Sequence, residues 1–367
     1  MNPEPQSPAP QAAPPSVAAQ DVPAIGSSAA ERARQEARRR VLHEFTVDVR
    51  RRLEGDTSPA GQLVSNHIGR QLDLAGSERY TRWFRDEGER SGFDQSTTLA
   101  AVAGSDVTKA APFSEAARAQ FGTTAEHVAT LVAQDDLRFG RAFAAFTPLE
   151  DLYMHAEAGR CYTQADLARR GAAALGRGDA EQLARETAEA ILGHDSFNAG
   201  FGRRKLKPLL IARHREPAEA FDYPTSRTPS GFLVQVLDRI EGCDPETMLR
   251  YVTEEIVQRQ GSIAQAIEIG LIDNFHFLLE VYEQIVRDSL AVLAPSQVPV
   301  FRESPAMQDF ILGLRRIAKI LVLLGDPPIL HPDGFYHLKR GTHRVRLDSL
   351  EAFRENFLAA AAAVVVA

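Results

Sequence analysis

Cysteine is nearly absent from this chain, and long apolar runs are missing. Among 367 residues only Cys161 and Cys243 are cysteines, and neither belongs to a CxxC motif or a cysteine–histidine spacing. A disulfide-rich scaffold and a cysteine-based zinc finger are therefore excluded. Uncharged apolar runs fall far short of the roughly 20 residues that cross a bilayer. The sequence thus predicts no membrane span.

Lysine is scarce as well. The 42 basic residues include only five lysines, and the formal net charge is −7. A chain that is negative overall lacks the electrostatic attraction for phosphate backbones that dedicated nucleic-acid binders use. We therefore do not expect nucleic acid to be the partner of this chain.

The first 30 residues differ from the rest in composition. They carry seven prolines and only two charged residues, Glu4 and Asp21. Such a segment buries too little apolar surface to offset the entropy of ordering, so residues 1–30 are predicted to be disordered. The tail has no basic n-region and no apolar h-region, which argues against a secretory signal peptide. Two interpretations remain: a tail without a role, or an unstructured export signal.

The clearest helix signal lies in residues 304–325. Ser304 is a good N-cap, and Pro305 suits the first helical position. Gly325 supplies a stop, and Gly313 in the middle predicts the close approach of a neighbouring helix. The apolar positions three or four apart, which define one face, are Met307, Phe310, Ile311, Leu314, Ile317, Leu321 and Leu324. Because Val322 and Leu323 widen this face, the end of the helix is predicted to be buried nearly all round.

Similar stripes recur along the chain and predict an all-α fold of elongated multi-helix bundles. The expected division is a disordered tail (1–30), N-terminal helices (31–112), a helical bundle (113–215), a linker (216–229), a second bundle (230–325), and a hairpin with a terminal helix (326–367). Within it, residues 91–112 are expected to form a loose connection. Helices are expected to begin at the capping box 147–150 and again at Thr163.

Candidate metal ligands are few and scattered. Asp151 with His155, and Asp273 with His276, are spaced to share a helix face, so either pair offers half of a carboxylate–histidine metal site. No second matching half is evident.

The other histidines suggest less. His194, before Asp195, is expected to cap the end of a helix. His337 and His343 are expected to face each other across the hairpin. Motifs such as GxSxG and HExxH are absent, so the sequence predicts no catalytic residues, metal, cofactor or small-molecule substrate. A helical metalloenzyme with Asp and His ligands remains an alternative.

Two basic clusters are candidate binding surfaces. The first follows Gly200 and Gly202 but lacks the GK[ST] of a phosphate loop, and is interpreted as a surface for protein partners. It comprises Arg203, Arg204, Lys205 and Lys207. The second lies on the predicted hairpin and suggests an alternative function, a DNA-binding regulator. It comprises Lys339, Arg340, Arg344 and Arg346.

Three stretches resemble the gatekeeper proteins of bacterial type III secretion systems (the HrpJ/YopN class). They are residues 181–210, 232–258 and 306–325, the last being similar to the family's Leu-rich helix. The resemblance implies a non-enzymatic protein that binds a secretion chaperone through its N-terminal region and docks on the export apparatus. It further implies control over the order of export, a location in the bacterial cytoplasm, and export through the type III channel.

Overall fold

The structure is a computed structural model that describes most of the chain. Within the described residues, no helix is both long and apolar enough to cross a membrane. Apart from its last two residues, the predicted disordered tail lies outside this set. The described residues are 29–110, 148–195, 206–215, 217–222, 225–250, 268–324, 329–330, 336–340, 343–347 and 350–365.

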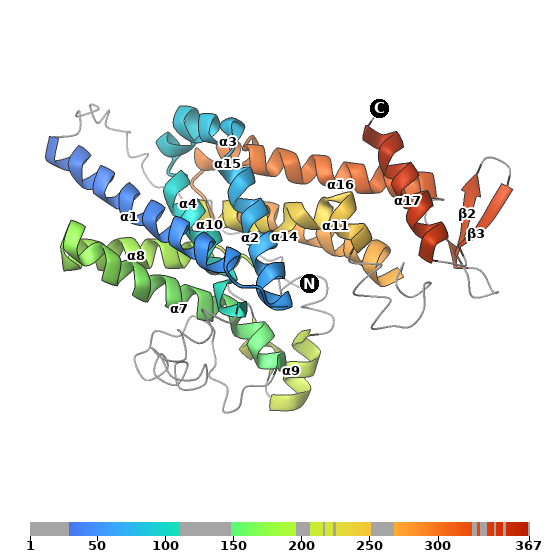
Figure 1. Ribbon diagram of the computed structural model, residues 1–367, viewed down its shortest axis with the longest axis horizontal. Helices are drawn as coiled ribbons and strands as arrows, with labels where there is room; N and C mark the ends of the chain where they lie inside the picture. Colours follow the sequence, from blue (N-terminus) through green and yellow to red (C-terminus); the bar gives the residue numbers. More distant parts are fainter. Residues whose placement is uncertain are drawn as a thin grey trace, which may run out of the picture.

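Helices dominate the described residues, which confirms the all-α prediction (Figure 1). The first part contains α1 (Ala29–Glu54), α2 (Pro59–Ala75), α3 (Glu78–Trp83), α4 (Gln95–Ser105) and the 3-10 turn η3 (Val107–Lys109). The middle contains α7 (Pro148–Leu175), α8 (Arg177–Ile191), α9 (Lys207–His214), α10 (Pro229–Ile240), η6 (Glu241–Cys243) and α11 (Pro245–Arg250). The last part contains η8 (Glu268–Asp273), α14 (Asn274–Val292), α15 (Gln297–Arg302), α16 (Pro305–Leu324), β1 (Ile329–Leu330), β2 (Tyr336–Arg340), β3 (His343–Leu347) and α17 (Leu350–Val365).

Helix α4 occupies the middle of the bundle, where the sequence analysis expected a loose connection. It contacts α1, α2, α7, α8 and α10. The Asp94 side chain caps its start by accepting a hydrogen bond from the Thr97 amide at 2.6 Å, and residues 100–105 are all buried. The prediction was wrong because α4 is covered on every side. Its small residues therefore carry no amphipathic period.

Glycine lets α4 and α7 cross at close range. A Cβ atom at Gly159 of α7 would lie 2.6 Å from the carbonyl oxygen of Gly104 in α4. Any larger residue at Gly159 would push the two backbones apart. Helix α7 runs unbroken through this crossing, so the expectation of a new helix start at Thr163 was wrong. Thr163 is fully buried within α7, beside Gly104.

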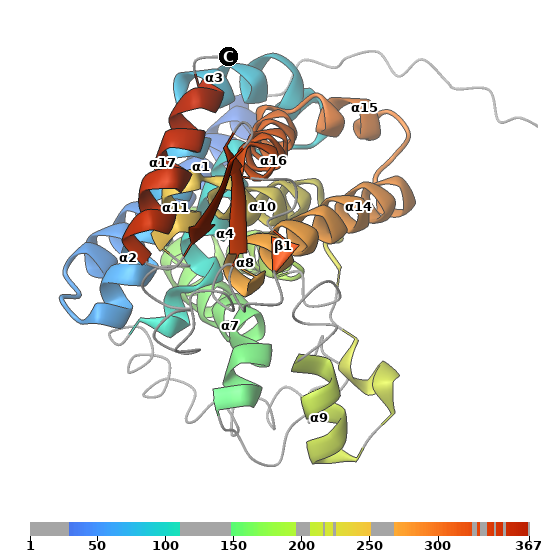
Figure 2. The ribbon, with the colours of Figure 1, turned by 90° about the vertical axis from the view of Figure 1, so that its right-hand side faces the viewer.

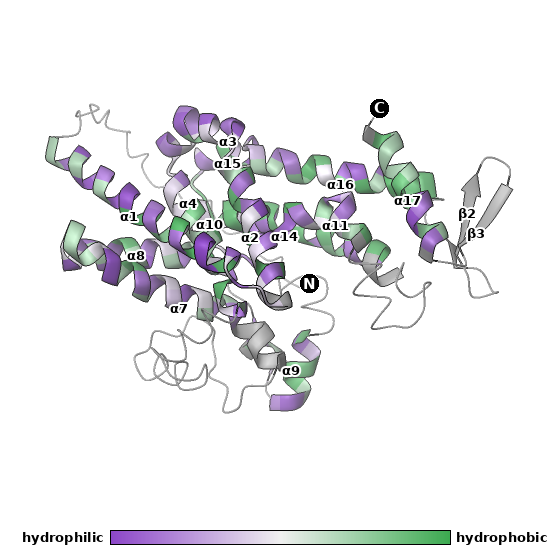
Figure 3. Cartoon of the chain, viewed as in Figure 1, coloured by the Kyte–Doolittle hydropathy of each residue, from purple (hydrophilic) through white to green (hydrophobic). Residues whose placement is uncertain are grey.

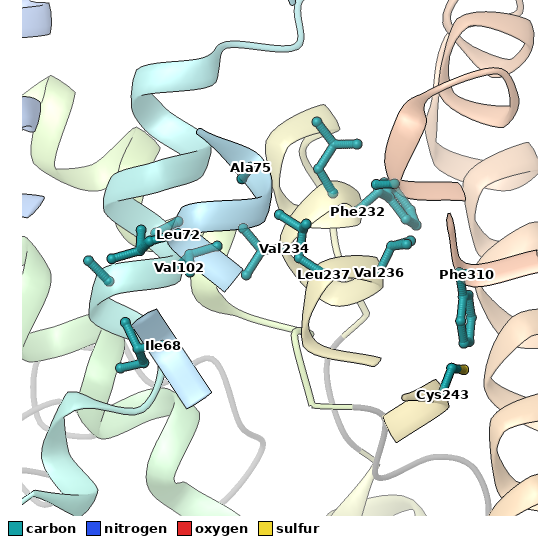
Figure 4. Close-up of a cluster of buried hydrophobic side chains, with 14 of the residues drawn as sticks. Ile68, Leu72, Ala75, Val102, Phe232, Val234, Val236, Leu237, Cys243 and Phe310 are labelled. Carbon is teal, nitrogen blue, oxygen red and sulfur yellow. The ribbon is translucent and has the colours of Figure 1, made fainter. Parts of the chain in front are cut away.

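Helix α10 joins the two sides of the hydrophobic core. Val234 and Leu237 face α2 and α4, whereas Phe232 and Val236 face α16 (Figure 4). All four side chains are buried because α10 has neighbours on both sides.

At one edge of the molecule, α9 contacts the short turn Ala218–Phe221 (Figure 2). The proposed division into domains stays a prediction.

Helix α16 has the predicted bounds and cap. The Met307 amide donates to Ser304 Oγ at 3.3 Å. A Cβ atom at Gly313 would lie 2.5 Å from Cβ of Cys243 in η6, which confirms the predicted close approach of a neighbour, here a short 3-10 turn. The expectation of an end buried all round was wrong. Val322 and Leu323 are exposed, because α17 and α10 cover only the opposite face, and apolar residues remain on the surface of α16 (Figure 3).

Replacing Leu314 with alanine should lower the free energy of unfolding by about 2–3 kcal/mol, since a buried leucine loses its transfer energy and leaves a cavity. Leu314 is 7% exposed, whereas Leu312 on the same helix is 56% exposed. Leu312→Ala should therefore change the free energy by less than about 0.5 kcal/mol. Urea unfolding followed by circular dichroism measures both. Equal effects would contradict this assignment of the buried face.

The C-terminal strands form the predicted hairpin. Strand β2 pairs antiparallel with β3, and β1 adds to the other edge of β2. The register places His337 opposite Arg346, and His343 opposite Arg340. The two histidines therefore do not face each other as expected.

Candidate metal centre

A buried cluster of histidines and aspartates lies where α2, α4, α7, α8 and α10 meet. We call it the His–Asp centre. Its members come from segments far apart in the sequence and are mostly buried. They are His67 and Gln71 of α2, Asp106 and Lys109 after α4, His155 of α7, His194 and Asp195 after α8, and Asp238, Arg239 and Glu241 at the end of α10.

Local backbone features bring these side chains together. Asp106 is the C-cap of α4, directly after the crossing with α7, and His155 lies one turn before Gly159 in that crossing. Gly193 ends α8 with φ of +83°, a left-handed conformation that suits glycine. That turn directs His194 and Asp195 back towards Asp106. The close helix crossing and the glycine turn thus position two of the four segments that surround Asp106.

Three side chains offer ligand atoms in the geometry of a cation site, which we call site A. Nε2 of His155 lies 3.5 Å from Asp106 Oδ1, and Nε2 of His194 lies 3.7 Å from the same oxygen. The three ligand atoms lie within 4.8 Å of one another. These separations exceed the 2.7–3.2 Å of an ordinary hydrogen bond. Ligands about 2.0–2.2 Å from a tetrahedral cation are about 3.3–3.6 Å apart.

A backbone carbonyl decides which ring nitrogen of His194 carries the hydrogen when the imidazole is neutral. Its Nδ1 lies 2.8 Å from the carbonyl oxygen of Ile191. A carbonyl only accepts hydrogen bonds, so Nδ1 carries the hydrogen. In the neutral imidazole, Nε2 then presents its lone pair towards Asp106 Oδ1. Histidine that binds a metal through one nitrogen commonly donates the other N–H to a carbonyl in this way. His194 thus has the tautomer of a metal ligand.

A single arginine holds the carboxylates on either side of Asp106. Nη2 of Arg239 lies 2.7 Å from Asp195 Oδ1 and 3.1 Å from Asp238 Oδ2. The other oxygens of these aspartates point inward: Asp195 Oδ2 is 3.1 Å from Nε2 of His155. Lys109 Nζ is 2.7 Å from Asp106 Oδ1, and that oxygen keeps a second lone pair for the imidazoles. Arg239, behind Asp195 and Asp238, therefore fixes the positions of their inner oxygens.

A second ligand set, site B, shares Asp106 with site A. Nε2 of His67 lies 2.9 Å from Asp238 Oδ1 and 3.4 Å from Asp106 Oδ2. Nδ1 of His67 lies 2.5 Å from Glu241 Oε2. The carboxylate behind the imidazole orients the ring and raises its basicity, as carboxylates do behind metal-bound histidines.

The charges of the centre favour the ionised forms of Asp106 and His67. Burial alone would raise the pKa of Asp106, but Lys109, His194 and His67 hold it well below its usual range. Burial alone would lower the pKa of His67, but Asp106, Asp238 and Glu241 raise it well above its usual range. The carboxylates therefore remain ionised at neutral pH. They attract a positive species, a proton or a metal ion, to the imidazole nitrogens.

The sequence analysis paired His155 with Asp151 as half of a metal site and found no second half. The structure instead brings His155 together with Asp106 and His194. The prediction that His194 caps α8 is confirmed by its contact with the Ile191 carbonyl. Asp273 and His276 are exposed on η8 and α14.

The predicted basic surfaces are placed only in part. Lys207 begins α9, where it pairs with Asp222. The other three residues of that cluster, Arg203, Arg204 and Lys205, lie outside the described residues. The basic residues of the hairpin lie on β2 and β3, and Lys339 is opposite Arg344 in the strand register. Binding of protein or DNA at these surfaces stays a prediction.

Comparisons of the chain with protein-family models, with curated proteins and with solved structures found no significant match. The likeness to type III secretion gatekeepers therefore rests on the three sequence stretches alone. Control of export order, chaperone binding, location in the bacterial cytoplasm and export through the type III channel stay predictions of that likeness. The neighbouring genes would test them, because needle, ATPase and chaperone genes would support a secretion role.

Proposed function

We propose that this chain is a helical metalloenzyme that holds a divalent transition-metal ion at site A and uses it to activate water for hydrolysis. The observation that carries the proposal is the convergence of His155 Nε2, His194 Nε2 and Asp106 Oδ1 in a buried position. Three protein ligands leave a fourth position for water, the usual arrangement of catalytic rather than structural zinc.

The ligand types favour particular ions and a particular chemistry. Two imidazoles and a carboxylate suit zinc, iron, manganese or cobalt better than calcium. An ion in such a site lowers the pKa of bound water towards about 7 and so supplies hydroxide at neutral pH. Asp195 Oδ2, beside His155, is placed either to accept the proton of that water or to become a further ligand.

Purified full-length protein should contain bound metal. We expect one or more equivalents of a divalent transition metal by elemental analysis, after expression and purification without chelators or an affinity tag that binds metals. After removal with a chelator, titration of Zn²⁺ or Mn²⁺ into the protein should restore binding in calorimetry. Less than about a fifth of an equivalent, together with no calorimetric signal for either ion, would contradict the proposal.

A further inference from the structure

We infer that site B binds a second divalent cation, so that Asp106 bridges two ions and the centre hydrolyses phosphoesters. This inference rests on the proposed function, because it needs site A as its first metal position. The ligand atoms of site B are His67 Nε2, Asp106 Oδ2 and Asp238 Oδ1. Pairs of ions about 3.5–4 Å apart act together in phosphatases and nucleases.

The distances in site B suit a cation. Adjacent ligands of an octahedral ion with bonds of about 2.1 Å are about 3.0 Å apart, and those of a tetrahedral ion are about 3.3–3.6 Å apart. The observed separations from Nε2 of His67 are 2.9 Å to Asp238 and 3.4 Å to Asp106. Asp106 gives Oδ2 to this site and Oδ1 to site A. One carboxylate therefore connects both sites.

The partners of His67 leave its Nε2 facing the cation position. Glu241 only accepts hydrogen bonds when it is ionised, so Nδ1 of His67 carries a hydrogen towards it. Arg70 pairs with the other oxygen of Glu241. The amide nitrogen of Gln71 also lies 2.8 Å from Nε2. Nε2 lies 2.9 Å from Asp238 Oδ1, a contact that is favourable with a proton on Nε2 and equally with a metal ion bound beside both atoms.

The charge balance indicates the substrate class. With neutral imidazoles, four carboxylates face three permanent cations, which leaves one net negative charge. They are Asp106, Asp195, Asp238 and Glu241, and Lys109, Arg239 and Arg70. Two divalent cations would change this to three net positive charges. A hydroxide together with the dianion of a phosphate monoester carries three negative charges, so this pair of ligands would neutralise the loaded centre.

Site B lies at the accessible edge of the centre. The side chain of His67 is 27% exposed and that of Lys109 is 39% exposed, whereas that of His155 is 4% exposed. An anionic substrate would therefore approach at site B. There the ammonium group of Lys109 would attract its phosphate.

The reaction follows from these positions. Ions held by His155, His194, Asp106, His67 and Asp238 would supply hydroxide and stabilise charge on the attacking and leaving oxygens. The hydroxide would form one P–O bond as the P–O bond to the alcohol breaks. The proton released by the water would pass to the leaving oxygen, so that water and phosphoester yield phosphate and alcohol.

Manganese loading and hydrolysis test the inference in the full-length chain. The wild-type protein should bind two Mn²⁺ and show the electron paramagnetic resonance signal of a coupled pair. It should hydrolyse p-nitrophenyl phosphate or bis(p-nitrophenyl) phosphate only when loaded. His67→Ala should bind one Mn²⁺, lose the coupled signal, and hydrolyse at least 100-fold more slowly. The control His276→Ala, at an exposed histidine of α14, should behave as wild type.

The outcomes separate this inference from the proposed function. No Mn²⁺ in the wild-type protein would overturn both. One Mn²⁺ in both wild type and His67→Ala would overturn site B and leave site A standing; His67 would then hold a proton between the carboxylates. Two Mn²⁺ without hydrolysis of either phosphoester would overturn the substrate class. A circular-dichroism spectrum of His67→Ala that matches wild type is required before its stoichiometry is compared.

Discussion

Replacing both His155 and His194 with alanine should weaken binding of the first cation by more than about 100-fold. Groups that only orient a ligand typically contribute 10–100-fold to metal affinity, and these two side chains supply two of the three ligand atoms of site A. Competition with a chelating dye of known affinity measures the loss. His276→Ala, at an exposed position on α14, is the matched control and should bind as wild type.

A stability measurement separates lost ligation from lost packing. At a cation concentration of 100 times Kd, the wild-type protein should gain about 2.7 kcal/mol in its free energy of unfolding. The double variant should gain nothing at the same concentration. Each protein is measured both with the cation and with chelator. The free energy lost to the cavity of the two missing rings is the same in both measurements, so it cancels in the difference. A cation-dependent gain of wild-type size in a folded double variant would show that the metal binds elsewhere.

The sequence predicted the helices that have one exposed face. Val41, Phe45, Val49 and Leu53 of α1 are spaced as a stripe and are all buried, and α16 behaves likewise. Periodicity reports a difference between two sides of a helix. Helix α4 has no such difference, because five other helices surround it. Hydrophobic periodicity therefore did not predict α4, the helix at the centre of the fold.

The His–Asp centre was missed for a different reason. Its ligands come from helices separated by long stretches of chain, and no two ligands of site A have the i,i+3 or i,i+4 spacing of a motif. His155 was singled out, but with Asp151 as its partner, and only the crossing of α4 and α7 brings Asp106 to it. One local signal did exist. A histidine and an aspartate directly after the helix-ending Gly193 are sharply positioned, because a left-handed turn fixes their direction.

Arg239→Met should lower the free energy of unfolding by about 3–5 kcal/mol in the presence of chelator, the usual cost of removing one partner of a buried ion pair. The guanidinium contacts both Asp195 and Asp238, so its loss leaves two buried carboxylates without their shared cation. Methionine keeps an apolar stem against Phe277, whose ring centre lies 5.3 Å from the guanidinium carbon. The expected loss is therefore mainly electrostatic. Urea unfolding followed by circular dichroism measures it.

Arg82→Met is the matched control, because Arg82 pairs with Glu78 in an ion pair that is largely exposed on α3. Exposed pairs contribute about 0–1 kcal/mol, so this variant should be nearly neutral. Saturating divalent cation should recover part of the loss in Arg239→Met, since the ion restores positive charge beside Asp238. Equal losses in the two variants would mean that the centre does not depend on Arg239 for its charge balance. The positions of the inner carboxylate oxygens would then be set by the backbone, and the arginine would be dispensable for metal binding as well.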